Sequence, residues 1–510
     1  MKSLAVCLLA LGTAIASAQT SPWEKEIVYQ IFERSFYDSN GDRIGDFNGI
    51  KQKLGYLKDL GVTAILLQPT FKARVYHNYF ADSFWQVDPA FGTNKSFFDM
   101  VRAAHKRHIK VILDMEIQYV ASLHPWYIAA KEHPGSPEAH RVMSMDGIFG
   151  MGAVYSYTGA KIPIATINSK DPAVLAESKK VFCYWAAPPD RPADGVDGFR
   201  LDHMMDDLDN KHQNVDMYQA FWTPIENAVR KIKPKTFFVA EQSDWAQIGT
   251  EQMTKGSVDS AYAIPLRAAF VNRFQGPSKG VKPYSPGDVQ DAIEKTIKGT
   301  PAGKTQLLVI EDHDVQRYAS LVHNNPRLLR LGAVFMLTMK GTPSIYYGQE
   351  LSMRGTQLHG KTDGNDIPVR LAMRWTHSVK SLGTATWYGS GPWNSRANSS
   401  DYDGRSVEEQ AHDARSILNF YRRMIRVRKA NPALSGGSIS LVRTSDPNVV
   451  AYLRSARGNA VLVLLNLNSV ATKVRFEPER GDSHAYSFVG RRTVHLDGYG
   501  YKLIVIRRAS

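Results

Sequence analysis

The sequence Val196-Asp-Gly-Phe-Arg-Leu-Asp202 has the pattern of a short buried strand that ends in a carboxylate. Arg200 and Asp202 are two positions apart, so their side chains fall on the same face of the strand. A guanidinium in that position favours the charged form of a carboxyl group, which makes Asp202 a candidate nucleophile. A purely structural ion pair would have the same pattern, and this segment alone leaves the two interpretations equal.

Similar apolar runs recur along the chain, and each is followed by a loop and an amphipathic segment. The runs cover residues 27–32, 62–67, 110–114, 196–202, 236–241, 258–264, 306–311 and 343–347. Strands that alternate with helices are typical of parallel βαβ units, so this pattern predicts an α/β fold, a (β/α)8 TIM barrel. A doubly wound sheet is the alternative, because periodicity does not report closure. In a barrel, functional side chains gather at the C-terminal ends of the strands.

The remaining segments define the expected domain organisation. Residues 1–18 resemble a signal peptide, with Lys2, an apolar stretch and the small-residue sequence Ala16-Ser-Ala18. The catalytic barrel is expected over 19–114 and 172–432, with a small inserted domain over 115–171 after the third strand. Strand patterns without intervening helices at 449–453, 460–465, 474–477 and 501–506 predict a C-terminal all-β sandwich domain over 433–510.

Composition narrows the classes of partner. The chain has 510 residues with a formal charge of +14 that is spread along the sequence, without a Lys/Arg block or nucleic-acid motif. We therefore expect no nucleic-acid partner. The leader is too short to span a bilayer and we find no later candidate span, so the mature chain is expected to be exported, either periplasmic or extracellular. The sequence carries no signal for an oligomeric state.

Acidic residues stand at the ends of several predicted strands, at Asp114, Asp202, Glu241 and Glu311-Asp-His-Asp314. Carboxylates that converge on one rim repel each other, which argues for a functional reason. Two carboxyl groups with different pKa values suit glycoside hydrolysis. Glu241 follows an apolar run that would raise its pKa and make it the acid, whereas Asp202 is the better nucleophile. Asp314 could hold sugar hydroxyls.

These segments resemble the α-amylase family of glycoside hydrolases (family 13). Gly198-Phe-Arg-Leu-Asp202, Phe238-Val-Ala-Glu241 and Glu311-Asp-His-Asp314 are similar to that family's nucleophile, acid/base and third-acid segments. The loop from Tyr76-His-Asn-Tyr79 onward resembles its sugar-stacking loop. The resemblance implies a retaining mechanism with Asp202 as nucleophile, Glu241 as acid/base and Asp314 as stabiliser.

The resemblance also implies substrate contacts and points to departures from the family. The candidate substrate-binding residues are Tyr79, His77, Arg200, His203, His313 and Arg370. Gln118-Tyr119 stands where the family usually has Asn-His, which removes a calcium ligand and a sugar contact. Met205-Asp206 replaces a Lys-His pair that serves leaving-side glucose units.

A metal site, separate from the family's calcium position near Gln118, is predicted in Asp38-Ser-Asn40-Gly-Asp42-Arg-Ile44-Gly-Asp46. Oxygen donors at alternate positions, with glycines between them, can wrap one hard cation, and Ile44 would contribute its carbonyl. The segment resembles the calcium loop after the first strand in oligosaccharide-cleaving branches of the family. A turn exposed to solvent is the alternative.

The expected function is hydrolysis of α-glucosidic bonds in maltodextrins or related α-glucans with retention. A transglycosylase or sugar isomerase that shares the covalent intermediate is one alternative. A non-catalytic glucan-binding protein on the same barrel is the other.

Overall fold

The computed structural model describes residues 20–242, 244–275, 284–389, 400–456, 458–477 and 493–507. The predicted signal peptide, residues 1–18, lies outside the described residues. Within the described part of the chain, every helix is too short or too polar to cross a lipid bilayer.

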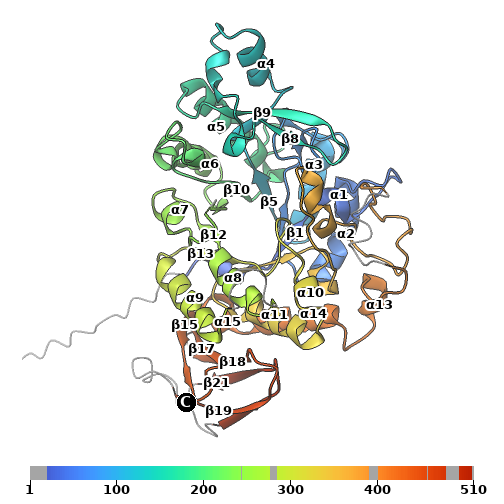
Figure 1. Cartoon of the computed structure of the whole chain (residues 1–510), viewed down its shortest axis with the longest axis vertical. Coiled ribbons are helices and arrows are strands. Elements are labelled where there is room, and N and C mark those ends of the chain that lie inside the picture. The colour runs from blue at the N-terminus through green and yellow to red at the C-terminus, as the bar shows by residue number, and fades with distance from the viewer. Residues whose placement is uncertain are drawn as a thin grey trace, which may run out of the picture.

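Eight parallel strands close into a barrel in the order β1-β14-β13-β12-β11-β10-β5-β2, which confirms the predicted TIM barrel (Figure 1). The strands are β1 (Val28–Ile31), β2 (Ala64–Leu67), β5 (Lys110–Met115), β10 (Gly198–Leu201), β11 (Phe237–Ala240), β12 (Ser260–Tyr262), β13 (Thr305–Leu308) and β14 (Thr342–Tyr346). Each overlaps one of the predicted apolar runs. Closure excludes the doubly wound alternative, because β1 pairs with both β2 and β14.

Alternation along the strands divides the barrel interior into two layers. Inward-facing residues near the strand starts, such as Ile112 and Val239, belong to a separate apolar cluster that Trp23 closes at the base. Two positions further along, the same face carries Asp114 on β5 and Glu241 after β11. The apolar layer therefore supports a polar layer at the C-terminal mouth.

Helices connect the barrel strands and surround the sheet. The helices are α1 (Glu33–Phe36), α2 (Phe47–Leu60), α3 (Asn94–His105), α5 (Pro172–Ala186), α6 (Thr223–Ile232), α7 (Thr250–Thr254), α8 (Ile264–Asn272), α9 (Pro286–Gly299), α10 (Tyr318–Leu321), α11 (Pro326–Thr338), α13 (Val407–Ala411), α14 (Ile417–Ala430) and α15 (Pro432–Gly436). Most begin at a recognisable cap: Asp171, for example, accepts from the backbone N–H groups of Ala173 and Val174 before Pro172 starts α5.

The connection between β5 and α5 forms a small antiparallel sheet above the barrel mouth (Figure 1). It consists of β6 (Tyr119–Ala121), β7 (Val142–Ser144), β8 (Ala153–Tyr155) and β9 (Lys161–Ile167), with α4 (Pro125–Glu132) beside them. A second excursion, between β2 and α3, carries the hairpin β3 (Phe71–Lys72) and β4 (Ser83–Val87). Both excursions supply walls to the mouth.

The C-terminal region contains two antiparallel sheets at the opposite end of the molecule from the inserted sheet (Figure 1). One consists of β15 (Ser438–Leu441), β17 (Val449–Ala456), β18 (Asn459–Asn466) and β21 (Tyr501–Arg507), and the other of β16 (Arg443–Thr444), β19 (Thr472–Glu477) and β20 (Thr493–Leu496). Val449, Leu462, Val474 and Leu496 from the two sheets share one buried cluster. This two-layer packing agrees with the expected sandwich.

One buried arginine ties the helix α14 to the base of the barrel. Arg428 donates hydrogen bonds to the backbone oxygens of Leu337, Met339, Glu24 and Gly341 at 2.6–3.2 Å. Burial lowers its pKa to about 9, but the four carbonyl oxygens replace the hydration it has lost.

We expect Arg428→Ala to destabilise the fold by at least about 3 kcal/mol, because several buried carbonyls would lose their donor. Thermal unfolding followed by circular dichroism measures this effect. Arg426→Ala, an exposed arginine on the same helix, is the matched control. Equal melting temperatures for the two variants would contradict the expectation.

Candidate active site

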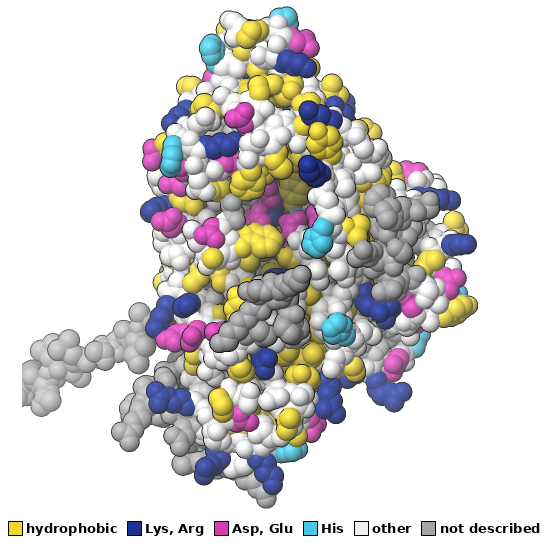
Figure 2. All heavy atoms as spheres, viewed as in Figure 1, with side chains coloured by type: hydrophobic (Ala, Val, Ile, Leu, Met, Phe, Trp, Pro, Cys, Tyr) yellow, Lys and Arg dark blue, Asp and Glu magenta, His cyan; other side chains and the backbone are white. Residues whose placement is uncertain are grey.

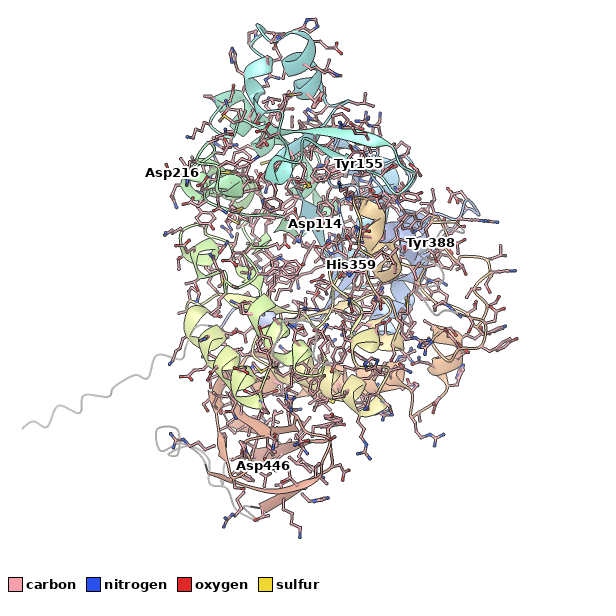
Figure 3. All side chains as sticks on the ribbon, in the orientation of Figure 1. Asp114, Tyr155, Asp216, His359, Tyr388 and Asp446 are labelled. Carbon is pink, nitrogen blue, oxygen red and sulfur yellow. The ribbon has the colours of Figure 1, made fainter. Side chains whose placement is uncertain are left out.

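The strand register brings the predicted catalytic residues to one mouth of the barrel. Arg200 on β10 pairs with Asp114 on β5 and with Val239 on β11. Asp202 and Glu241 each come one residue after their strand ends, so they stand side by side at the C-terminal rim. Figure 3 shows Asp114 near the middle of the barrel domain.

Arg200 contacts all three of these carboxylates. Its Nη1 lies 3.0 Å from Asp114 Oδ1 and also contacts Asp202 Oδ1, while its Nη2 lies 3.1 Å from Glu241 Oε2. Its side chain is only 1% exposed, whereas those of Asp202 and Glu241 are 14% and 13% exposed. The guanidinium therefore lies beneath two carboxyl groups that both reach the cleft.

Burial raises the pKa of Glu241 to about 7, against the opposing charge of Arg200. The direction of this shift agrees with the raised pKa expected after an apolar strand, and the role of Glu241 as the acid stays a prediction. Burial also raises the pKa of Asp202, although Arg200 pulls that pKa down. Only the influence of Arg200 could be expected from the sequence, because the cover that the surrounding loops give to the strand end depends on tertiary structure.

Asp314 lies on the loop after β13. That strand ends at Leu308, earlier than the predicted run, so Asp314 belongs to a loop rather than to the strand end. Its carboxylate lies 3.0 Å from His313 Nε2 and 2.9 Å from Arg370 Nη2. Burial raises its pKa, but these two groups outweigh it and hold the pKa well below its usual range. Asp314 is therefore a fixed negative charge.

Asp202, Glu241 and Asp314 share a cleft of about 460 Å³. The cleft is lined by His77, Tyr79, Phe80, Glu116, Ile148, Phe149, Met151, Val154, Asp202, His203, Glu241, Trp245, Asp314, Asp363, Asp366 and Arg370. Figure 2 shows acidic side chains within a central hollow, with hydrophobic side chains around it. A cleft of this size, with converging polar groups, can hold a sugar ring and its leaving group.

The predicted substrate-binding residues divide into two groups. Tyr79, His77, His203 and Arg370 line the cleft, whereas Arg200 and His313 are buried behind it. His313 Nε2 lies 2.8 Å from the hydroxyl of Tyr79, and the two rings are stacked at 5.9 Å. The buried pair therefore orients residues that reach the cleft.

Several cleft residues were missed by the sequence analysis. Phe149, Met151 and Trp245 are large apolar side chains on loops, and nothing in the sequence separates them from core residues. Asp366 pairs with Arg370 at 3.3 Å, four residues along the chain, a spacing that a search for charged pairs would have found. Glu116, Ile148, Val154 and Asp363 also line the cleft and were not predicted.

Gln118 and Tyr119, which depart from the family's usual Asn-His, have structural roles. The Gln118 Nε2 group donates to the backbone oxygens of Asp202 at 2.7 Å and of His203 at 3.1 Å. The Tyr119 hydroxyl donates to Asp209 Oδ1 at 2.9 Å, and His203 Nε2 lies 2.9 Å from the same oxygen. These contacts hold the loop that follows the candidate nucleophile.

The predicted calcium loop forms a tight turn before α2. Asp38 accepts from the backbone N–H groups of Asn40, Gly41 and Arg43, and Asp42 accepts from Ile44. Asp46 instead caps α2, with Gly49 N 2.8 Å from its Oδ1. The donor set has the hard oxygens that calcium prefers. Asp38 Oδ1 and Asp46 Oδ1 each already accept two hydrogen bonds, whereas the second oxygen of each carboxylate accepts one and keeps a further lone pair.

A different group of side chains brings its possible metal ligands closer together than the acids of this loop. Among the described residues, the cluster of three His, Cys, Asp or Glu side chains with ligand atoms within 4.8 Å is Asp312, His313 and Asp314. Because His313 and Asp314 already pair with each other at the cleft, we assign no metal to that cluster. Calcium in the Asp38–Asp46 segment stays a prediction.

Comparison with known proteins agrees with this geometry. Residues 30–146 and 154–437 match the family described as Alpha amylase, catalytic domain, so the chain belongs to the alpha-amylase family. It is an enzyme of that family, which acts on α-glucans.

Individual relatives match the chain over most of its length. The chain is 28% identical to "Alpha-amylase 3" of Dictyoglomus thermophilum, over 90% of this chain and 88% of the relative. It is also 28% identical to the "4-alpha-glucanotransferase" of Thermotoga neapolitana, over 89% and 98%. The solved structure of alpha-amylase from H. orenii superposes with a TM-score of 0.74 at 26% identity, over 95% of this chain and 100% of that chain.

Proposed function

We propose that the protein is a retaining hydrolase of α-glucosidic bonds in maltodextrins or related α-glucans. The observation that carries this proposal is the pair Asp202 and Glu241, which share one buried guanidinium and face one cleft. A raised pKa suits Glu241 to proton donation. Contact with a permanent cation suits Asp202 to nucleophilic attack.

The reaction then has two steps. The Asp202 carboxylate forms a bond to the anomeric carbon while Glu241 gives its proton to the departing glycosidic oxygen. Water next attacks the same carbon, its proton passes to Glu241, and the bond to Asp202 breaks. Asp314, held ionised by His313 and Arg370, stabilises the positive charge on the sugar ring in both transition states.

The stereochemistry of the first product tests the proposal. Proton NMR of maltotriose hydrolysis should show the α-anomer of the new reducing end first, followed by mutarotation. The β-anomer appearing first would exclude a covalent intermediate on Asp202. A lack of turnover on maltotriose, starch, pullulan and trehalose together would refute the hydrolase assignment.

A transglycosylase is the second candidate, favoured by the similarity to a protein named 4-alpha-glucanotransferase. It would use the same intermediate but let a sugar hydroxyl replace water. Chromatography of the products from maltoheptaose separates the two, because transfer gives chains longer than the substrate and hydrolysis does not.

We also propose that calcium binds the loop through Asp38, Asn40, Asp42, Asp46 and the carbonyl of Ile44. Calcium added to chelator-treated protein should raise the melting temperature. The free energy of unfolding should increase by about 2.7 kcal/mol when free calcium is 100 times Kd. Asp42→Asn should weaken this response, whereas Asp190→Asn, at an exposed acid elsewhere, should not. A melting temperature that ignores calcium would contradict the proposal.

The leader sequence supports export, so we propose that the mature chain functions in the periplasm or outside the cell. N-terminal sequencing of protein secreted by an expressing host should begin at Gln19. A first residue of Met1 would contradict this.

A further inference from the structure

The cleft has two chemically different halves. One half is polar and is formed by His77, Tyr79, Asp314, Asp363, Asp366 and Arg370. The other, here called the apolar half, is formed by Ile148, Phe149, Met151 and Trp245. Phe149, Met151 and Trp245 are 58%, 56% and 41% exposed, so their apolar surface is open to a ligand in the cleft. Such exposed groups mark places where an apolar ligand docks.

The apolar half lies on the side of the acid Glu241. The ring of Phe149 packs edge-on against His203 at 4.9 Å, and the backbone N–H of His203 donates to Glu241 Oε2 at 3.3 Å. Trp245 stands in the loop that follows Glu241. Because Glu241 gives its proton to the departing oxygen, the group attached to that oxygen rests against this half.

The polar groups near the apolar half already have partners. Asp209 accepts from the Tyr119 hydroxyl, from Phe149 N and from His203 Nε2, each at 2.9 Å. The side chains here that can offer a hydrogen bond to a leaving group are His203, through its other ring nitrogen, and Trp245, through its indole N–H. A departing glucose unit presents several hydroxyls that need partners, and burying them here would cost free energy.

The backbone conformation of Phe149 sets where its ring lies. Its φ is 49°, in the left-handed region that disfavours a bulky side chain. The hydrogen bond from its N–H to Asp209 holds it in that conformation. The strained conformation holds an apolar ring at the cleft beside the catalytic acid.

We propose that the leaving-group side of the cleft accepts an apolar alcohol, an alkyl or aryl aglycone, in addition to the glucose units of an α-glucan. The inference rests on the proposed glucosidase function and names the substrate class of the same site. The polar half binds the glucosyl ring, and the apolar half buries the hydrocarbon of the alcohol that departs.

Alkyl α-D-glucosides from ethyl to octyl test this, since their leaving alcohols have nearly equal acidity and differ in apolar area. Below the critical micelle concentration, kcat/KM should rise about tenfold or more from ethyl to octyl. Trp245→Ser and Phe149→Ser should each bring the octyl-to-ethyl ratio towards one. Val470→Ser, at an exposed apolar residue of the C-terminal region, should keep the wild-type ratio.

Maltose, run alongside, separates failure of this inference from failure of the proposed function. Turnover of maltose with no dependence on alkyl length, or an equal ratio in all variants, overturns the inference and leaves the hydrolase intact. If neither maltose nor any alkyl glucoside is turned over, the hydrolase proposal fails, and calorimetric binding decides the inference. Tighter binding of octyl than ethyl glucoside, lost in Trp245→Ser, supports it, and equal affinities overturn it.

Discussion

Asp202→Asn is expected to lower kcat by about four orders of magnitude or more on every α-glucan that the wild type cleaves. Asparagine has the same size and keeps the Oδ1 atom that contacts Arg200, so the strand end should stay folded. What is lost is the negative charge that forms the bond to the anomeric carbon. Steady-state rates on maltotriose, with melting temperatures of both proteins, measure the two effects separately.

A chemical rescue distinguishes a nucleophile from a residue that only binds substrate. Asp202→Ala opens space beside the anomeric carbon, and added azide should restore turnover of an activated α-glucoside as the β-glucosyl azide. Asp190→Asn, at an exposed acid in the connection before β10, is the control and should keep the wild-type rate. Full activity of the Asp202→Asn protein on α-glucans would end the retaining mechanism.

The barrel could be predicted because each strand carries its own signal. Runs such as the one ending at Asp202 are short, apolar and followed by amphipathic segments, and this local pattern does not depend on distant contacts. The acids could be placed because a parallel barrel brings all C-terminal strand ends to one mouth. Sequence alone therefore located Asp202, Glu241 and Asp314 in one cleft.

Contacts between distant segments could not be predicted in the same way. Arg200 reaches three carboxylates only because β5, β10 and β11 pair in register, and Asp209 gains its role from the folding of its loop back onto His203 and Tyr119. The exposure of a side chain could not be predicted either. Phe149 and Trp245 are large apolar residues of the kind that usually lie in a core, but they line the cleft. These features depend on loop conformation, which composition does not encode.

Glu241→Gln is expected to lower kcat/KM on maltose by about 10²–10⁴-fold, because the amide cannot donate a proton to the leaving oxygen. The loss should be far smaller on 2,4-dinitrophenyl α-glucoside, whose leaving group departs without protonation. Glutamine keeps the atoms that contact Arg200 and the backbone of His203, so the fold should survive. Equal losses on the two substrates would assign Glu241 to binding instead.

The pH dependence follows from the same residue. Burial, together with the negative charge of Asp202, raises the pKa of Glu241 to about 7 against the pull of Arg200. The first step needs the protonated acid, so kcat/KM on maltose should fall as pH rises through about 7, and Glu241→Gln should lack this basic limb. A basic limb that persists in the variant would place the titrating group elsewhere.

The covalent intermediate should then reverse the role of Glu241. Once Asp202 is bonded to the sugar its charge is gone, and with it one of the influences that raise the pKa of Glu241. The pKa falls, the carboxyl group ionises, and it can accept the proton of the attacking water. With the dinitrophenyl substrate, where the second step limits kcat, the rate should fall on acidification with an apparent pKa below 7. An apparent pKa at or above 7 for that step would show that the charge of Asp202 does not control Glu241.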